Sequence, residues 1–194
     1  MLLSSSSIIK MPPPRYARNI LIFVPLLLLV LSWLYAGTEG YFSSTRFCVS
    51  CHSMTYPERE LRASSHFGPL GFAPECGDCH LPPSFFERAA THAIDGVKDV
   101  VNEVRYNIKT EEEFDRYRAG FAHKARIRLK KWDSSPCRTC HRNPVPKNDW
   151  ARPFHEEMKG GRKTCIDCHQ NIFHKRVPEE DLDRGIAENR IVER

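Results

Sequence analysis

The sequence of 194 residues has few of the features from which an ordinary globular core is built. Its mean hydropathy is −0.48, and it has no second apolar run to match the one near its N-terminus. Charged residues make up 27% of the chain and there are 14 prolines, so little apolar material is left for a folded interior. This composition argues against a cytosolic α/β enzyme.

Cysteine is too scarce for a disulfide scaffold, since eight residues are only about 4% of the chain. No cysteine lies outside a Cys-x-x-Cys pair, and a histidine follows each pair directly. The cysteines are Cys48, Cys51, Cys76, Cys79, Cys137, Cys140, Cys165 and Cys168, and the histidines that follow them are His52, His80, His141 and His169. A simple disulfide-stapled toxin is therefore also excluded.

The spacing of these motifs has a chemical explanation. Two thiols three residues apart can bond to the two vinyl groups of one haem, and the adjacent histidine then reaches the iron. The sequence therefore predicts four covalently attached haem c groups. The alternative is zinc, with the first two pairs forming one four-thiolate site and the last two another. Zinc leaves the four histidines unexplained, and disulfide or redox-active pairs explain them no better.

A run without charged residues extends from Asn19 to Thr38. As a helix it would span roughly 30 Å, the thickness of a bilayer core. Lys10, Arg15 and Arg18 precede it, so residues 1–18 are expected in the cytoplasm and the chain from residue 39 in the periplasm of a bacterial inner membrane. A cleaved signal peptide is the alternative, and it also places the cysteines outside the cytoplasm.

The chain contains an internal repeat. Cys48 precedes Cys76 by the same interval that separates Cys137 from Cys165, and an additional histidine follows the first motif of each half at the same distance. The sequence predicts a mostly α fold with much irregular loop, built from the single anchor and a haem domain over residues 39–178. Two related two-haem modules are expected over residues 45–105 and 134–178, with a linker helix over 110–132 and a charged tail over 179–194.

Low-spin haem iron needs a second axial ligand, and five histidines outside the motifs can supply one. They are His66, His92, His123, His155 and His174. The repeat favours His66 and His155. His174 follows His169 too closely to reach the far side of the same iron, so it is expected to serve another haem. His123 lies in a basic stretch and is expected in solvent.

Two helices are predicted between the repeats. Ser84 and Glu87 form a capping-box pattern for a helix to about Asn107, and Thr110 with Glu113 starts another to about Trp132. The first helix places His92, Asp95 and Asp99 on one face. That face is either the solvated side of an amphipathic helix or a proton-accepting site, which the oxidation of a membrane quinol requires.

Residues 15–178 resemble the NapC/NirT/NrfH family of membrane-anchored tetrahaem cytochromes c. The resemblance rests on the anchor, the four motifs and three segments, CVSCHSM at 48–54, THAIDGVKDV at 91–100 and CIDCHQNIFH at 165–174. It implies a quinol dehydrogenase that takes electrons from membrane quinol and passes them through its haems to a periplasmic reductase of the nitrite or nitrate type.

The resemblance also implies roles for single residues. Met54 resembles the residue that binds the first haem iron in place of His52, and Asp99 resembles the acid beside that haem. His92 falls where some members have a quinol-site lysine. His174 resembles the distal ligand of the second haem and His66 that of the third. For His155 the resemblance indicates the fourth haem, whereas the repeat indicates the first.

Two other functions remain open at this point. A membrane-tethered shuttle could receive electrons from a protein donor without a quinol site, and a haem left open could reduce a small oxyanion itself, although the sequence shows no dedicated distal pocket. The formal charge of +5 does not support nucleic-acid binding, because each haem adds about two propionates. The expected partners are the lipid bilayer, quinol and the reductase, either in a hetero-complex or with further copies of the chain.

Overall fold

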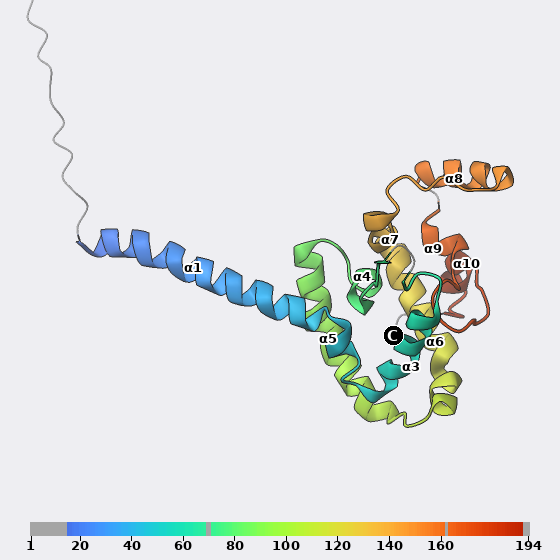
Figure 1. Ribbon diagram of the computed structural model, residues 1–194, viewed down its shortest axis with the longest axis horizontal. Coiled ribbons are helices and arrows are strands. Elements are labelled where there is room, and N and C mark those ends of the chain that lie inside the picture. Colours follow the sequence, from blue (N-terminus) through green and yellow to red (C-terminus); the bar gives the residue numbers. More distant parts are fainter. Residues whose placement is uncertain (1–14, 69–70, 162, 192–194) are drawn as a thin grey trace, which may run out of the picture. The chain divides into compact units, whose positions relative to one another are not determined.

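The computed structural model describes residues 15–68, 71–161 and 163–191. These residues form helices and loops, and none of them lies in a strand (Figure 1). The contacts divide the chain into two units, one up to Gly40 and one from Tyr41 onward. The predicted fold class, mostly α with much irregular loop, is confirmed.

The first unit is the helix α1, which runs from Arg15 to Phe42 and ends just inside the second unit. None of its residues is buried, and it contains Pro25. It is long and apolar enough to cross a membrane. The helix extends beyond the charge-free run at both ends, because the flanking polar residues continue the helical backbone. Of the predicted cytoplasmic segment, residues 1–14 lie outside the described part of the chain.

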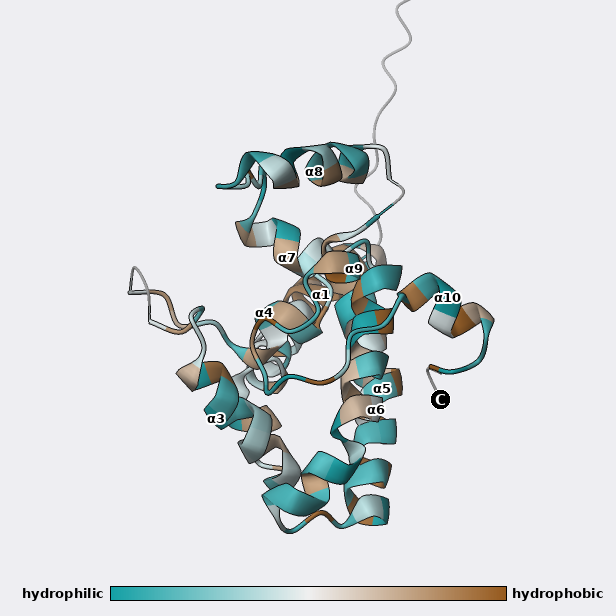
Figure 2. Ribbon diagram, turned by 90° about the vertical axis from the view of Figure 1, so that its right-hand side faces the viewer, coloured by the Kyte–Doolittle hydropathy of each residue, from teal (hydrophilic) through white to brown (hydrophobic). Residues whose placement is uncertain are grey.

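The second unit combines two long helices with short ones. The long helices are α5 (Phe85–Tyr106) and α6 (Glu111–Lys131). The short elements are α2 (Thr45–Cys48), η1 (His52–Met54), α3 (Thr55–Ala63), α4 (Cys76–His80), α7 (Ser135–Cys140), η3 (Asp149–Ala151), α8 (Arg152–Lys159), α9 (Cys165–Cys168) and α10 (Leu182–Ala187). Helix α8 lies at the edge of this unit, and its ribbon is largely hydrophilic (Figures 1 and 2).

The two long helices begin where the sequence predicts, but for different reasons. In α6 the Thr110 hydroxyl accepts a hydrogen bond from the Glu113 N–H at 3.2 Å, and the Glu113 carboxylate accepts one from the Thr110 N–H, so this capping box is confirmed. Ser84 is the N-cap residue of α5, but its side chain makes no capping hydrogen bond. The capping box predicted for Ser84 and Glu87 is therefore wrong. Asn107 ends α5 in the left-handed conformation that asparagine tolerates.

The buried apolar core is small, as the composition predicts. Tyr56, Ile108 and Phe114 form one cluster, and the partly buried Phe121 packs against it, so the aromatic stripe of α6 is used for packing. Ile127, Ile166, Leu182 and Ile191 form the other cluster. Helix α6 is therefore more than a linker. The described part of the predicted charged tail is also packed, and Leu182 is only 1% exposed.

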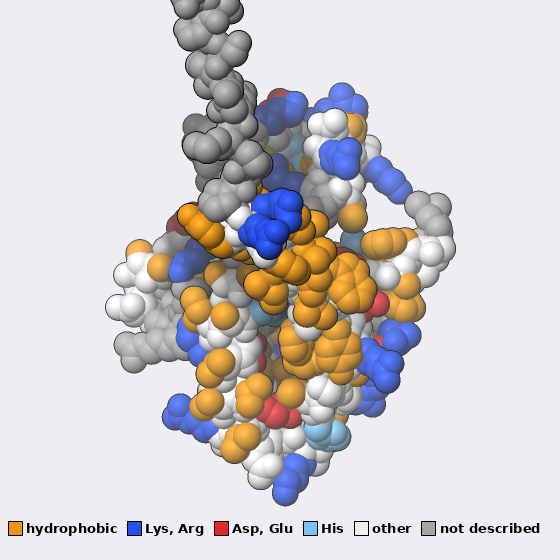
Figure 3. All heavy atoms as spheres, turned by 90° about the vertical axis from the view of Figure 1, so that its left-hand side faces the viewer, with side chains coloured by type: hydrophobic (Ala, Val, Ile, Leu, Met, Phe, Trp, Pro, Cys, Tyr) orange, Lys and Arg blue, Asp and Glu red, His pale blue; other side chains and the backbone are white. Residues whose placement is uncertain are grey.

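Helix α5 presents its apolar side to solvent. Phe86 is 81% exposed and Val104 is 77% exposed, and Figure 3 shows apolar side chains at the molecular surface. The polar side of α5 makes the internal contacts, since Asp95 forms an ion pair with Arg128 at 3.3 Å.

Gly77, inside the second motif, is required by close packing. It is buried in α4, and a Cβ atom there would overlap the Ser43 carbonyl oxygen and lie 3.2 Å from a methyl of Leu81. We expect Gly77→Ala to lower the free energy of unfolding by about 1–3 kcal/mol. Gly120→Ala, in an open position of α6, should instead raise it by up to about 1 kcal/mol. Thermal unfolding of the haem-loaded proteins measures both, and equal stability of the two variants would contradict the prediction.

Candidate haem and electron-transfer site

Short helices hold three of the motifs, on α4, α7 and α9, and the first motif begins at the end of α2. Residues three apart lie on one side of a helical turn, so the two thiols of a motif come together. Asp78 and Asp167 occupy the same position in the second and fourth motifs. Each carboxylate accepts a hydrogen bond at 2.8 Å from the backbone N–H that precedes the motif, which fixes the start of its helix.

Each motif lies in space beside the motif that follows it in the sequence. Helix α2 contacts α4, and α4 contacts α7. The thiol of Cys48 lies beside that of Cys76, and the thiol of Cys79 lies within electrostatic range of Cys137. Cys137 in turn lies within range of Cys165. The four attachment points therefore follow one another through the unit as they do along the sequence.

Three of the motif histidines face a second histidine ring. The ring centroids are 6.1 Å apart for His80 and His174, 6.2 Å apart for His141 and His66, and 6.2 Å apart for His169 and His155. An imidazole nitrogen bonds a metal ion at about 2 Å, so two rings on opposite sides of one ion have centroids about 6 Å apart. Each pair thus leaves the space that one metal atom between two imidazoles needs, and the donor set fits haem iron.

The pairing crosses the predicted modules. His66 comes from the first half of the unit and faces His141 in the second, whereas His174 from the second half faces His80 in the first. His155 faces His169 within its own half, so the two histidines related by the repeat are used differently. The repeat in the sequence therefore does not extend to the ring pairing, and the two predicted modules remain a prediction.

The first motif has a different arrangement. The Nε2 atom of His52 lies 3.0 Å from the Tyr56 hydroxyl and 3.1 Å from the carbonyl oxygen of Lys109. This ring nitrogen is the one that would bind an iron, and it is engaged with protein groups. Within the described residues, no second histidine ring faces His52.

Met54 lies at the end of η1 and is 38% exposed. The turn that carries it is anchored to α5, because the Glu103 carboxylate accepts hydrogen bonds from the backbone N–H of Ser53, at 3.2 Å, and from its hydroxyl. Ser53 is buried, so this anchor is shielded from water. The sequence analysis missed Glu103, although it continues the face of Asp99 one helical turn later.

The structure separates the roles of the three residues predicted on one face of α5. Asp95 is paired with Arg128, and Lys98 lies 3.5 Å away. Asp99 lies within electrostatic range of Cys51. Loss of surrounding water, together with repulsion from Asp95, raises the pKa of Asp99 against the opposing effect of Arg128. The residue remains accessible to solvent.

His92 lies on the same helix, and its ring packs against Phe42 with centroids 6.5 Å apart. Both residues belong to the unit that begins at Tyr41. Phe42 also contacts Phe47, next to the first motif, at 4.8 Å between centroids. His92 is therefore connected to the start of the first motif through two aromatic rings, and Asp99 lies within electrostatic range of Cys51.

A cavity of about 640 Å³ opens beside the first motif. Its lining residues are His52, Glu103, Val104, Asn107, Ile108 and Lys109. It lies between the turn that carries Met54 and the last turn of α5.

His123 is only partly buried, and its Nδ1 lies 3.3 Å from a guanidinium nitrogen of Arg126. Among the described residues, no motif histidine faces it. The structure thus sets His123 apart from His66, His155 and His174, each of which faces a motif histidine.

The comparisons with known proteins identify the family. The family model for the N-terminal region of the NapC/NirT cytochrome c family matches residues 12–180. No solved structure matches this chain.

Several curated proteins are similar to this chain. A probable tetrahaem cytochrome c-type protein of Nitrosomonas europaea is 46% identical over 170 residues, which are 86% of this chain and 73% of the relative. The cytochrome c-type protein NapC of Haemophilus influenzae is 31% identical over 92% of this chain and 91% of its own length. The protein TorY of the same organism is 33% identical over 78% of this chain, which covers 42% of TorY.

These matches confirm the resemblance seen in the sequence and support haem c as the cofactor. Together with α1, they indicate a membrane-anchored cytochrome of a respiratory electron-transfer system. This chain belongs to the NapC/NirT cytochrome c family.

Proposed function

We propose that this protein is a membrane-anchored tetrahaem cytochrome c that oxidises membrane quinol and delivers the electrons to a periplasmic reductase of the nitrite or nitrate type. The observation that carries the proposal is the contrast among the four motifs. Three motif histidines face a second histidine across the space for one metal atom, and the fourth, His52, is engaged elsewhere.

The ring pairs support a proposal for which residues would hold each haem iron. His80 and His174 would hold the iron of the second haem, His141 and His66 that of the third, and His169 and His155 that of the fourth. Met54 is the ligand of the first iron, because His52 is bound to Tyr56 and Lys109. When bound, the four haems would supply one-electron carriers.

The first motif is where quinol would react. Oxidation of quinol releases protons, so a base is needed at that site. Asp99 meets this need, since it lies near Cys51, remains accessible to water and has a raised pKa. Asp95 is held by Arg128 and serves the packing of α5 on α6. His92 would contribute to the boundary of the site through its packing on Phe42.

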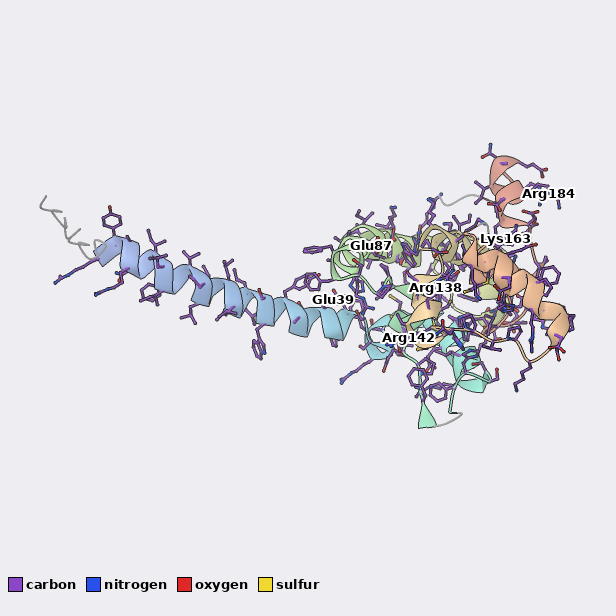
Figure 4. The ribbon with its side chains drawn as sticks, turned by 90° about the horizontal axis from the view of Figure 1, so that it is seen from above. Glu39, Glu87, Arg138, Arg142, Lys163 and Arg184 are labelled. Atoms are coloured by element: carbon purple, nitrogen blue, oxygen red, sulfur yellow. The ribbon has the colours of Figure 1, made fainter. Side chains whose placement is uncertain are left out.

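The charges near the third and fourth motifs suit bound haem. Arg138 lies on α7, Arg142 lies two residues after the end of α7, and Lys163 lies two residues before the start of α9 (Figure 4). Each haem brings about two propionates, so these cations would supply local counter-charge. The positive-inside rule would place the N-terminus in the cytoplasm and this unit in the periplasm, where the electrons are passed on to the reductase.

The proposal is tested with the full chain, loaded with haem, in liposomes that contain a quinol. We expect reduction of the haems by the quinol, and inhibition of that reduction by a redox-inactive quinol analogue. A protein that is reduced by a soluble protein donor, and not by quinol, would instead be the membrane-tethered shuttle. The haem content of the same preparation gives the number of haems independently.

A further inference from the structure

A carboxylate lies behind one of the distal histidines. The Nδ1 atom of His174, on the side of the ring away from its proposed iron, lies 3.6 Å from an oxygen of Glu60 on α3. This Nδ1 is buried and makes no hydrogen bond within the described part of the chain. A shift of a few tenths of an ångström would close the contact into a hydrogen bond.

Glu60 is held in this position from two directions. A guanidinium nitrogen of Arg118, on α6, lies 2.9 Å from the same carboxylate oxygen, and the backbone N–H of Lys175 donates to it at 2.9 Å. The Arg118 side chain is only 8% exposed, and its guanidinium also pairs with Asp115. Residues from two distant parts of the chain, α6 and the segment after His174, thus fix this one carboxylate.

The other two distal histidines have different neighbours at the same atom. The Nδ1 atom of His155 donates a hydrogen bond to the carbonyl oxygen of Ala151 at 2.9 Å. The Nδ1 atom of His66 is buried, and none of the described residues forms a hydrogen bond with it. The three proposed distal ligands therefore differ in the group behind the ring: a charged carboxylate, a neutral carbonyl and no hydrogen-bond partner.

We propose that Glu60 is a positioning residue for His174 and makes the haem bound by His80 and His174 harder to reduce. The inference rests on the proposed assignment of these two histidines to one haem. A carboxylate behind a metal-bound imidazole fixes the ring orientation and increases its basicity. Its negative charge also favours the ferric over the ferrous iron. Both effects lower the reduction potential of that haem relative to the other two bis-histidine haems.

The test is a redox titration of the haem-loaded full chain in detergent, followed by absorption and electron paramagnetic resonance. Glu60→Gln keeps the shape of the side chain and removes its charge. We expect the ratio of reduced to oxidised haem at one site to rise about tenfold at fixed solution potential, with all bis-histidine signals retained. Glu60→Asp keeps the charge but retracts it, and should shift the same haem in the same direction by less.

Glu111→Gln is the matched control, because Glu111 is an exposed partner of Arg59 on the neighbouring helix surface. It should leave all four potentials unchanged. Unchanged potentials in Glu60→Gln, with all low-spin signals present, would overturn the inference. The ligand assignment is tested separately by His174→Ala. If His174→Ala loses one bis-histidine signal while Glu60→Gln changes no reduction potential, then His174 is a haem ligand and Glu60 does not set the potential of that haem.

Discussion

Replacement of Asp99 by asparagine is expected to slow the reduction of the haems by a quinol analogue by about 100-fold or more. Asparagine has the same shape but cannot accept a proton. In the folded protein, partial loss of water raises the pKa of Asp99, which makes its carboxylate a stronger base than an ordinary aspartate. Stopped-flow measurement of haem reduction gives the rate, and the absorption spectrum should remain that of the natural protein.

Asp95→Asn is the control for this variant. It makes the same chemical change on the same face of α5, but at a residue whose carboxylate is paired with Arg128. Its rate should fall far less than that of Asp99→Asn, because Asp99 stays in place as the base and loses only the repulsion from Asp95. If Asp99→Asn is reduced by the quinol analogue as fast as the natural protein, or if both variants are slowed equally, Asp99 is not the proton acceptor. Reduction by dithionite, which needs no proton acceptor, should be unaffected in either variant.

Single replacement of His66, His155 or His174 by alanine is expected to convert one of the haems from low spin to high spin. Each substitution removes one imidazole from a facing pair, so the iron between them loses its sixth ligand. Electron paramagnetic resonance of the oxidised protein resolves the bis-histidine signals, and each variant should lose a different one. His123→Ala is the matched control and should keep every signal.

The His155 variant distinguishes the two predictions made from the sequence, in which His155 binds either the fourth haem or the first. The structure places His155 against His169, so its loss should affect the haem attached at Cys165 and Cys168. The repeat in the sequence predicts an effect on the haem at Cys48 and Cys51. Combination with His52→Gln sharpens the result, because His52 is bound to Tyr56 and Lys109 and its loss should leave the first haem with its Met54 ligand.

The sequence predicts features that depend on local chemistry. The apolar run of α1, the two long helices and the capping box at Thr110 are set by neighbouring residues, and the structure has them at nearly the predicted positions. The haem motifs are equally local, since covalent attachment needs only a few adjacent side chains. The small core follows from composition alone.

Pairing between distant segments cannot be predicted from neighbouring residues in this way. The repeat gives His66 and His155 the same place after a motif, yet His66 faces a histidine of the other half and His155 one of its own. The difference depends on how distant segments pack, which the residues beside each histidine do not determine. Glu60 and Arg118 are similar cases, because charged residues in polar helices give no local sign that they meet beside His174.

The crossed histidine pairs have a consequence for maturation. If this unit is exported as proposed above, the second motif would leave the translocation channel well before His174, the residue that faces His80. A haem attached there at that stage would have one protein ligand, and the other would arrive only after the last motif had emerged. Attachment and ligation are therefore separate events in time, and contacts of such long sequence range form slowly. The attachment machinery or a chaperone would have to shield a partly ligated, reactive haem until the C-terminal segment folds back.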